Sequence, residues 1–243
     1  MFGIILRKLN NKKYFLIIKR FLNDIKYLFM KDQYPNKIFC IGMNKTGTTS
    51  MQKALEDLGY KVGDQAEAEI IAIPTLKGKF SYLMNYCKAS EAFQDVPFSR
   101  RNVYKSLDQR FPNSKFILTV RDDADTWYES LIRFHKKRLS KDGLPTRVRD
   151  SKKSIYRYKG WEYDMAKLVW LKGRKYFNED FVRDETICKE YYNTHNKEAM
   201  EYFKGRDNFL VLNLKDNDAY NKFCEFIGRN PMYDRFPHEN SSR

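Results

Sequence analysis

The stretch KIFCIGMNKTGTTS, residues 37–50, decides the fold. Lys37–Ile41 is a short apolar run typical of a strand, and Ser50–Leu58 carries apolar residues at helical spacing. Gly42 and Gly47 lie in the turn between them, where glycines let the backbone fold closely around a bound anion. The free N–H groups and the positive dipole of the following helix attract negative charge. This context predicts a phosphate-binding turn between a strand and a helix.

The rest of the chain alternates between strand-like and helix-like stretches. We expect strands at Glu91–Val96, Lys115–Val120 and Phe209–Leu214, helices at Tyr104–Phe111, Ala124–Lys137 and Ala219–Ile227, and a helix-rich region over 161–203. Strands that alternate with helices favour parallel βαβ units. The expected fold class is therefore α/β.

Composition excludes several classes of protein. Of 243 residues, 42% are hydrophobic, which is enough for a buried core and argues against wholesale disorder. No apolar run approaches the length of a membrane-spanning helix. The spacing of the cysteines and histidines matches no disulfide framework and no metal motif, so we expect no metal and a reducing compartment; these residues are Cys40, Cys87, Cys188 and Cys224, and His135, His195 and His238.

The net charge of +15 suggests an anionic partner, and it is concentrated in two segments. Residues 1–31 hold eight Lys or Arg side chains and one acid, Asp24. In this segment we expect a basic amphipathic helix over about 1–32, with one apolar stripe formed by Ile18, Phe21, Leu22, Ile25, Leu28 and Phe29. Two interpretations stay open: the stripe attaches to an anionic membrane surface or a partner groove, or it packs on its own domain.

The second basic segment covers residues 133–159 and holds eleven Lys or Arg side chains against two acids. Gly143, Pro145 and Gly160 interrupt it, which predicts a loop or lid with broken helices, a basic insert at about 133–160. The segment is either a solvated charged surface or a contact for an anionic substrate.

The turn at 42–50 departs from a nucleotide-triphosphate loop in one respect. Such a loop places Lys directly after its second glycine, whereas this chain has Thr48 there and its lysine at Lys45. A γ-phosphoryl group is normally handled with Mg²⁺ and that lysine. A sulfuryl group carries one negative charge, for which a single lysine and backbone donors suffice without metal.

The KTGTTS run, residues 45–50, resembles the phosphosulfate-binding loop of the sulfotransferases that use 3′-phosphoadenosine 5′-phosphosulfate (PAPS). In that family a Lys-Thr/Ser-Gly-Thr/Ser-Thr/Ser run grips the 5′ end of the cofactor. The resemblance implies cofactor contacts from Asn44, Lys45, Thr46, Gly47, Thr48, Thr49 and Ser50. It also implies that Lys45 stabilises the charge on the oxygen between sulfur and phosphorus.

A second motif supports the same family. Its members end a later strand in an Arg, followed eight or nine residues on by a Ser, and the two side chains hold the 3′-phosphate. Here Arg121 follows the Lys115–Val120 strand and Ser130 lies nine residues beyond it. The planar fork of Arg suits a phosphate. The alternative for Arg121 is a salt bridge to Asp122 or Asp123.

The resemblance extends from about Lys37 to the end of the chain, where residues 236–240 look like the C-terminus of bacterial sulfotransferase-like proteins. It implies a three-layer sandwich, with a central parallel sheet flanked by helices, as in nucleotide kinases with a P-loop. We therefore expect a sulfotransferase domain at 33–243.

The acceptor base is the least defined part of the site. Family members use a histidine in a Lys-Thr-His strand or a glutamate, and this chain has no Lys-Thr-His. At the mouth of the strand before that of Arg121 stands Asp95, our candidate general base. The alternative is a carboxylate that caps the Val-Pro turn. His135, Glu67 and Glu69 remain other candidates for the base.

The expected activity is transfer of a sulfuryl group from PAPS to a hydroxyl or an amine, with adenosine 3′,5′-bisphosphate as the second product. The acceptor would be an anionic glycan, lipid or small molecule. The alternatives are a nucleotide or small-molecule kinase or NTPase, and a non-catalytic basic protein that binds polyanions or membranes. We see no nucleic-acid-binding motif. We expect a cytoplasmic enzyme that rests on a membrane face, and the oligomeric state is open.

Overall fold

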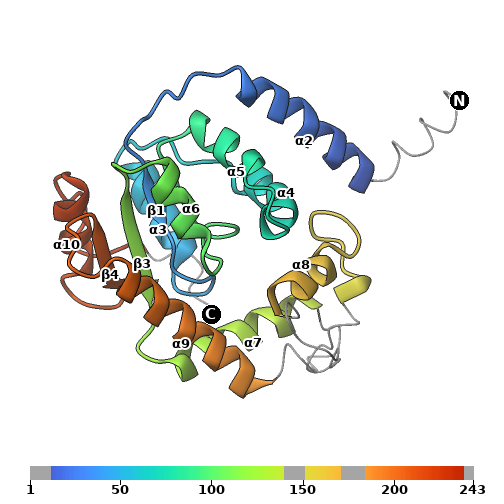
Figure 1. Ribbon diagram of the computed structural model, residues 1–243. Helices are drawn as coiled ribbons and strands as arrows, with labels where there is room; N and C mark the ends of the chain where they lie inside the picture. The colour runs from blue at the N-terminus through green and yellow to red at the C-terminus, as the bar shows by residue number, and fades with distance from the viewer. Residues whose placement is uncertain (1–11, 140–150, 171–183, 238–243) are drawn as a thin grey trace, which may run out of the picture.

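The computed structural model describes residues 12–139, 151–170 and 184–237. Its strands are β1 (Ile38–Cys40), β2 (Ala92–Phe93), β3 (Lys115–Val120) and β4 (Phe209–Asn213). Its helices are α2 (Lys12–Leu28), α3 (Thr48–Asp57), α4 (Gln65–Leu76), α5 (Ser81–Tyr86), the 3₁₀ turn η1 (Cys87–Ala89), α6 (Val103–Arg110), α7 (Ala124–Leu139), α8 (Trp161–Trp170), α9 (Glu185–Tyr202) and α10 (Ala219–Ile227). The fold is therefore α/β, as predicted (Figure 1).

The four strands form one parallel sheet in the order β2-β1-β3-β4. Ile38 of β1 pairs with Ala92 of β2 and with Lys115 of β3. Because all strands run the same way, the segments that follow them meet at one edge of the sheet. That edge collects the turn at 42–50, Asp95 and Arg121, which are the sequence-predicted site residues.

Alternation along the strands divides the core into two layers. Phe39 and Phe116 face one layer with residues of α4, α5, α6 and α9, while Ile38 and Ile117 face the other with residues of α3 and α10. Both faces of the sheet are thus covered by helices, which is why the strands are apolar throughout. The result is the predicted sandwich of helices, sheet and helices.

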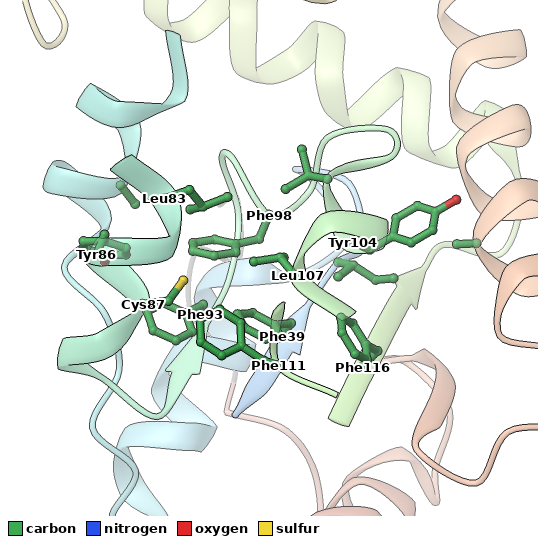
Figure 2. Packing of buried hydrophobic residues seen from close by; sticks show 14 of the residues in the cluster. Phe39, Leu83, Tyr86, Cys87, Phe93, Phe98, Tyr104, Leu107, Phe111 and Phe116 are labelled. Carbon is green, nitrogen blue, oxygen red and sulfur yellow. The ribbon is translucent and has the colours of Figure 1, made fainter. Parts of the chain in front are cut away.

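Aromatic rings fill the middle of the first layer (Figure 2). The ring of Phe39 lies 5.4 Å from that of Phe93, 5.9 Å from that of Phe98 and 5.4 Å from that of Phe116, measured between centroids. These side chains are almost fully buried. The short strands are therefore held together mainly by the side chains between sheet and helices, because rings of this size bury large apolar areas.

Most of the expected elements agree with the structure to within one to three residues, and Lys115–Val120 and Ala219–Ile227 agree at both ends. The expected strand Glu91–Val96 is shorter, because Asp95 has a φ of 57° and leaves the extended conformation. The helix-rich region contains α8 and α9, and its residues 171–183 lie outside the described part of the chain. Sequence analysis did not identify α4 and α5.

The N-terminal helix α2 lies beside α4 and α5, away from the sheet (Figure 1). It begins at Lys12, and residues 1–11 of the expected basic helix lie outside the described part. Among the helices that the structure describes, none is both long and apolar enough to cross a membrane.

Candidate functional site

The turn between β1 and α3 has an unusual backbone. Lys45 has a φ of 75° and Gly47 a φ of 99°, so two residues of the loop adopt the left-handed conformation. Glycine adopts it without penalty, whereas a lysine needs support from its surroundings. The support comes from hydrogen bonds to the backbone carbonyl groups of the loop.

Four donors bind the carbonyl groups at and before this loop. His195 Nε2 lies 2.9 Å from the carbonyl oxygen of Ile41, and Thr46 Oγ1 donates to that of Met43 at 2.6 Å. Trp127 Nε1 donates to Asn44 at 2.9 Å, and Arg121 Nε donates to Lys45 at 2.8 Å. The donors come from α9, the loop itself, α7 and the end of β3. The loop is therefore set by the tertiary structure before any ligand arrives.

Two glycines are required by this geometry. A Cβ built on Gly42 would lie 2.0 Å from Thr119 Oγ1 and 2.4 Å from the carbonyl oxygen of Thr119. The loop thus leaves β1 in direct contact with the backbone of β3. At Gly47 a Cβ would lie 2.6 Å from Leu214 Cδ2, in addition to the strain of a positive φ. Sequence analysis identified both glycines by their spacing.

The N-terminus of α3 differs from those of two other helices. In α4 and α9 the N-cap residues are Asp64 and Asp184, and their carboxylates accept bonds from Glu67 N and Ile187 N. The N-cap residue of α3 is Gly47, which supplies no side-chain acceptor, and the first turn holds no acid. The first-turn amides of α3 therefore keep a positive field that no side chain of the cap neutralises.

The ammonium group of Lys45 lies against α7. Its Nζ is 3.6 Å from the centroid of the Phe134 ring, a close cation–π contact. Ser130 precedes Phe134 by four residues, so the two side chains share a face of α7. Lys45 thus contacts the face of α7 on which Ser130, another predicted site residue, is also placed.

Arg121 joins the loop through the bond from its Nε to Lys45. The salt bridges considered as an alternative are not present in the described part of the chain: Asp122 accepts bonds from Lys215 at 2.7 Å and Asn213 at 2.6 Å, and Asp123 accepts from Thr126 N. The Arg121 backbone N–H donates to Tyr192 Oη of α9 at 2.9 Å. The guanidinium is therefore half-buried beside the loop without a carboxylate at salt-bridge distance.

Asp95 contacts both the loop and its own turn. Its Oδ2 accepts a bond from Thr48 Oγ1 at 2.9 Å, and its Oδ1 accepts one from Val96 N at 2.8 Å. The first bond joins the end of β2 to the start of α3, and the second caps the turn at Val96 and Pro97. The capping contact considered as the alternative is therefore present, and the bond from Thr48 joins the carboxylate to the loop. Asp95 is half-buried, so one side of it is open to solvent.

The other candidates for the base make different contacts. Glu67 accepts bonds from Asn23 and Tyr27 of α2, and burial raises the pKa of its carboxyl group. Glu69 pairs with Arg157, and burial again raises its pKa against the effect of that arginine. His135 follows Phe134 on α7, with its ring 5.6 Å from that of Phe134. Neither glutamate has a hydrogen bond to the loop among the described residues.

His195 has a structural part in the site that sequence analysis missed. Burial lowers the pKa of its imidazole to about 4, so the ring is neutral at pH 7. A carbonyl oxygen can only accept, and Nε2 must therefore carry the proton toward Ile41. The ring of Trp127 is fully buried and stacks on Tyr192, with centroids 4.7 Å apart.

The remaining predictions concern the cysteines, a metal site, the basic insert and the C-terminal tail. The four cysteines are free and buried. The described residues contain no cluster of His, Cys, Asp and Glu that could hold a metal ion. Of the basic insert, residues 140–150 lie outside the described part, as do residues 238–243 of the C-terminal tail. Phe236 of that tail packs on Tyr220 and Phe223 of α10.

Comparison with known proteins agrees with this arrangement. A search of curated proteins finds no match for the chain. A family model described as a sulfotransferase domain matches residues 37–243, which include the sheet, the loop and every candidate site residue, but not α2. The chain therefore belongs to the sulfotransferase family.

Proposed function

We propose that this protein transfers a sulfuryl group from PAPS to a hydroxyl or an amine of its acceptor. The observation that carries the proposal is the hydrogen bond from Arg121 Nε to the carbonyl oxygen of Lys45, 2.8 Å long. It joins the two motifs that the sequence relates to the 5′ and 3′ ends of the cofactor. PAPS, when bound, supplies the sulfuryl group and leaves as adenosine 3′,5′-bisphosphate.

The residues of the loop fit the 5′ end of this cofactor. The amides of Thr48 and Thr49 begin α3 without an acidic cap, and Lys45 adds a positive charge to the loop. The ammonium group lies against the ring of Phe134, in a cation–π contact. In this role Lys45 stabilises the negative charge that develops on the leaving oxygen, a contribution that reaches about 3–4 kcal/mol for one well-placed group. Asn44, Thr46, Gly47 and Ser50 complete the loop.

Arg121 and Ser130 are the proposed ligands of the 3′-phosphate. The acids beside Arg121 are occupied by Lys215 and by the start of α7, so they do not compete strongly for its guanidinium. Arginine presents two parallel donors to a phosphate, and a serine hydroxyl adds a third. The half-buried positions of both side chains support this role.

Asp95 is the proposed general base that takes the proton of the acceptor hydroxyl. The hydroxyl of Thr48, a residue of the loop, donates a hydrogen bond to the Asp95 carboxylate and keeps it beside the loop. In the proposed reaction the acceptor approaches the sulfuryl group at this place. The bond from Val96 N orients the carboxylate. A carboxylate with two orienting bonds still has lone pairs free on both oxygens.

The acceptor and the cellular setting complete the proposal. The basic residues 133–159 favour an anionic acceptor, a glycan, a lipid headgroup or an acidic metabolite. We further propose that residues 33–243 form the catalytic domain, that residues 1–32 form a separate basic helical segment, and that the enzyme works in the cytoplasm.

Nucleotide binding tests this proposal without knowledge of the acceptor. We expect adenosine 3′,5′-bisphosphate to raise the melting temperature of the protein with or without Mg²⁺, and more than adenosine 5′-monophosphate does. ATP with Mg²⁺ should have less effect. Stabilisation by ATP with Mg²⁺ alone would instead indicate a kinase, and equal stabilisation by any polyanion would indicate a non-catalytic binding protein.

Two variants sharpen the test. Arg121→Ala should lose the preference for the bisphosphate over the monophosphate, because the 3′-phosphate loses its bidentate partner. Asp95→Asn should keep that preference, because the amide retains an acceptor for Val96 N and the proposed role of Asp95 concerns the acceptor. Arg229→Ala, which removes a guanidinium at the end of α10, is the matched control and should behave as wild type.

A further inference from the structure

Helix α2 uses its polar side to pack against the domain. Asn23 Nδ2 and Tyr27 Oη donate to Glu67 of α4 at 2.9 Å and 3.1 Å, and Asn85 of α5 donates to Asp24 at 3.1 Å. The guanidinium of Arg20 lies 5.0 Å from the ring centroid of Tyr82. Among the apolar side chains of this helix, Leu16 and Tyr27 join the hydrophobic clusters of the domain.

The opposite side of α2 is apolar and exposed. We call it the outer face, and it consists of Phe15, Ile18, Phe21, Leu22, Ile25 and Leu28. The exposed fraction of the side chain is 57% for Phe21 and 59% for Leu22. Phe29, the residue directly after the helix, is 82% exposed. At 100° per residue these positions lie about 180° from the packed residues. The stripe that sequence analysis identified therefore does not pack on its own domain.

An apolar surface of this extent needs a partner. Single exposed hydrophobic residues are common, but a continuous face along about four helical turns is typical of an interaction site. The described part of the domain does not cover it, because the polar side of α2 is the side bound to α4 and α5. The matched family domain also begins at residue 37, after this helix. The outer face therefore serves a function separate from the sulfotransferase fold.

The charges around α2 define the kind of partner. Lys19 and Lys26 are exposed beside the outer face, whereas the single acid of the helix, Asp24, binds Asn85 on the inner side. An apolar face with lysines along its edge matches the boundary between the acyl chains and the anionic headgroups of a bilayer. In an antiparallel, two-fold pair of α2 helices, the same lysine edges would face and repel each other.

A cavity of about 440 Å³ between α2, α4 and α8 carries positive charge on the packed side of α2. Lys13, Arg20, Lys77 and Lys167 line it together with one acid, Asp164, which accepts bonds from Tyr158 and Lys13. Ile17 belongs both to this lining and to the exposed apolar residues of α2. The cations of this cavity therefore lie behind the outer face, and Ile17 is the residue that joins the two surfaces.

We propose that the outer face of α2 docks the protein on the surface of an anionic membrane. The helix lies in the plane of the headgroups, because its polar side stays bound to the domain and no described helix can span a bilayer. This proposal does not depend on the identity of the sulfuryl donor. It does imply that the enzyme meets its acceptor at a membrane.

Flotation of the full-length protein with lipid vesicles tests the docking. We expect binding to vesicles of phosphatidylcholine that contain phosphatidylglycerol at about one lipid in three, and much weaker binding to phosphatidylcholine alone. The variant Phe15→Gln/Leu22→Gln/Phe29→Gln should weaken the partition by about tenfold or more, because it removes the apolar contacts. The matched control Ile155→Gln/Met200→Gln/Met232→Gln changes three exposed hydrophobic residues elsewhere and should bind as wild type.

The contribution of charge has its own pair of variants. Lys19→Gln/Lys26→Gln should reduce binding to the anionic vesicles by about tenfold, and its effect should shrink at high salt. Lys197→Gln/Lys204→Gln, on and after α9, removes the same charge from another surface and should have little effect.

Three outcomes would overturn the proposal: no binding of wild type to anionic vesicles, binding that the triple Gln variant leaves unchanged, or a dimer that forms in solution through this face while vesicles do not bind. Sedimentation velocity of wild type and of the triple variant detects the dimer. Stabilisation by adenosine 3′,5′-bisphosphate, measured on the same samples, should be equal in all variants. Equal stabilisation shows that each variant is folded. Because this measurement does not involve vesicles, it separates a failure of membrane docking from a failure of the proposed sulfuryl transfer.

Discussion

The loop at 42–50 and helix α2 place their functional groups in opposite ways. In the loop, donors from several elements hold the backbone in one conformation, and this backbone positions its amides and the side chain of Lys45. In α2 the proposed function belongs to exposed side chains, and the outer face makes few contacts with the rest of the domain. A change in the loop backbone therefore alters both structure and chemistry. A change on the outer face of α2 should alter neither the structure nor the chemistry of the site, and should affect only the binding of the protein to a membrane.

The largest expected effect is that of Lys45→Ala on transfer. Loss of the ammonium group should lower the rate of adenosine 3′,5′-bisphosphate formation from PAPS by about 10²–10³-fold. Sulfuryl transfer would then be nearly abolished. The melting temperature and vesicle binding should stay close to wild type, because the side chain is half-buried and lies outside the core. Product formation can be followed by chromatography.

Lys53→Ala, which removes a lysine from the following helix, is the control for this variant. It should retain activity. Full activity of Lys45→Ala would contradict the assignment of this lysine, and loss of vesicle binding in the same variant would break the separation between the loop and α2.

The next effect concerns stability. Gly42→Ala forces a Cβ against the backbone of Thr119, and we expect it to lower the free energy of unfolding by about 3 kcal/mol, measured with urea. Gly78→Ala is the control for backbone strain without a steric clash, since Gly78 has a φ of 89° and open space around it, whereas Gly42 is not among the glycines with a positive φ. It should cost about 1 kcal/mol. Equal costs would mean that the close approach of loop and β3 is not needed.

The smallest effect, about 2 kcal/mol between pH 7 and pH 5, is a dependence of stability on pH through His195. Its pKa is about 4 in the folded protein against 6.5 ordinarily, so the unfolded chain binds more protons between these values. Stability from this group is complete above pH 6.5 and falls as the pH drops toward 4, by about 3 kcal/mol in all.

Denaturant unfolding at pH 7 and pH 5 checks this dependence. His195→Gln keeps a donor for Ile41 but does not titrate, so the difference between wild type and variant isolates the histidine from the carboxylates. An equal response of both proteins to pH would show that His195 does not support the loop in its neutral form. For outer-face variants of α2, the free energy of unfolding should change between pH 7 and pH 5 by the same amount as for wild type.

Much of the fold could be predicted because local patterns encode it. The Lys115–Val120 strand and the Ala219–Ile227 helix follow from runs of apolar residues and from helical spacing. Helix α4 could not be predicted in the same way. It is buried between α2, α8 and the core, carries apolar residues on most sides and contains Pro74, so it lacks the polar face that reveals a helix.

By itself the sequence determined the kind of site: KTGTTS after a strand, an Arg at the end of a later strand, and an amphipathic N-terminal helix. These signals are local, because glycine spacing and helical periodicity act over a few residues. Only the tertiary structure decided which groups support the loop, since His195 and Trp127 lie 154 and 83 residues from the carbonyls they bind. It also decided that α2 turns its polar side inward, because the partners of that side, on α4 and α5, come together only in the folded chain.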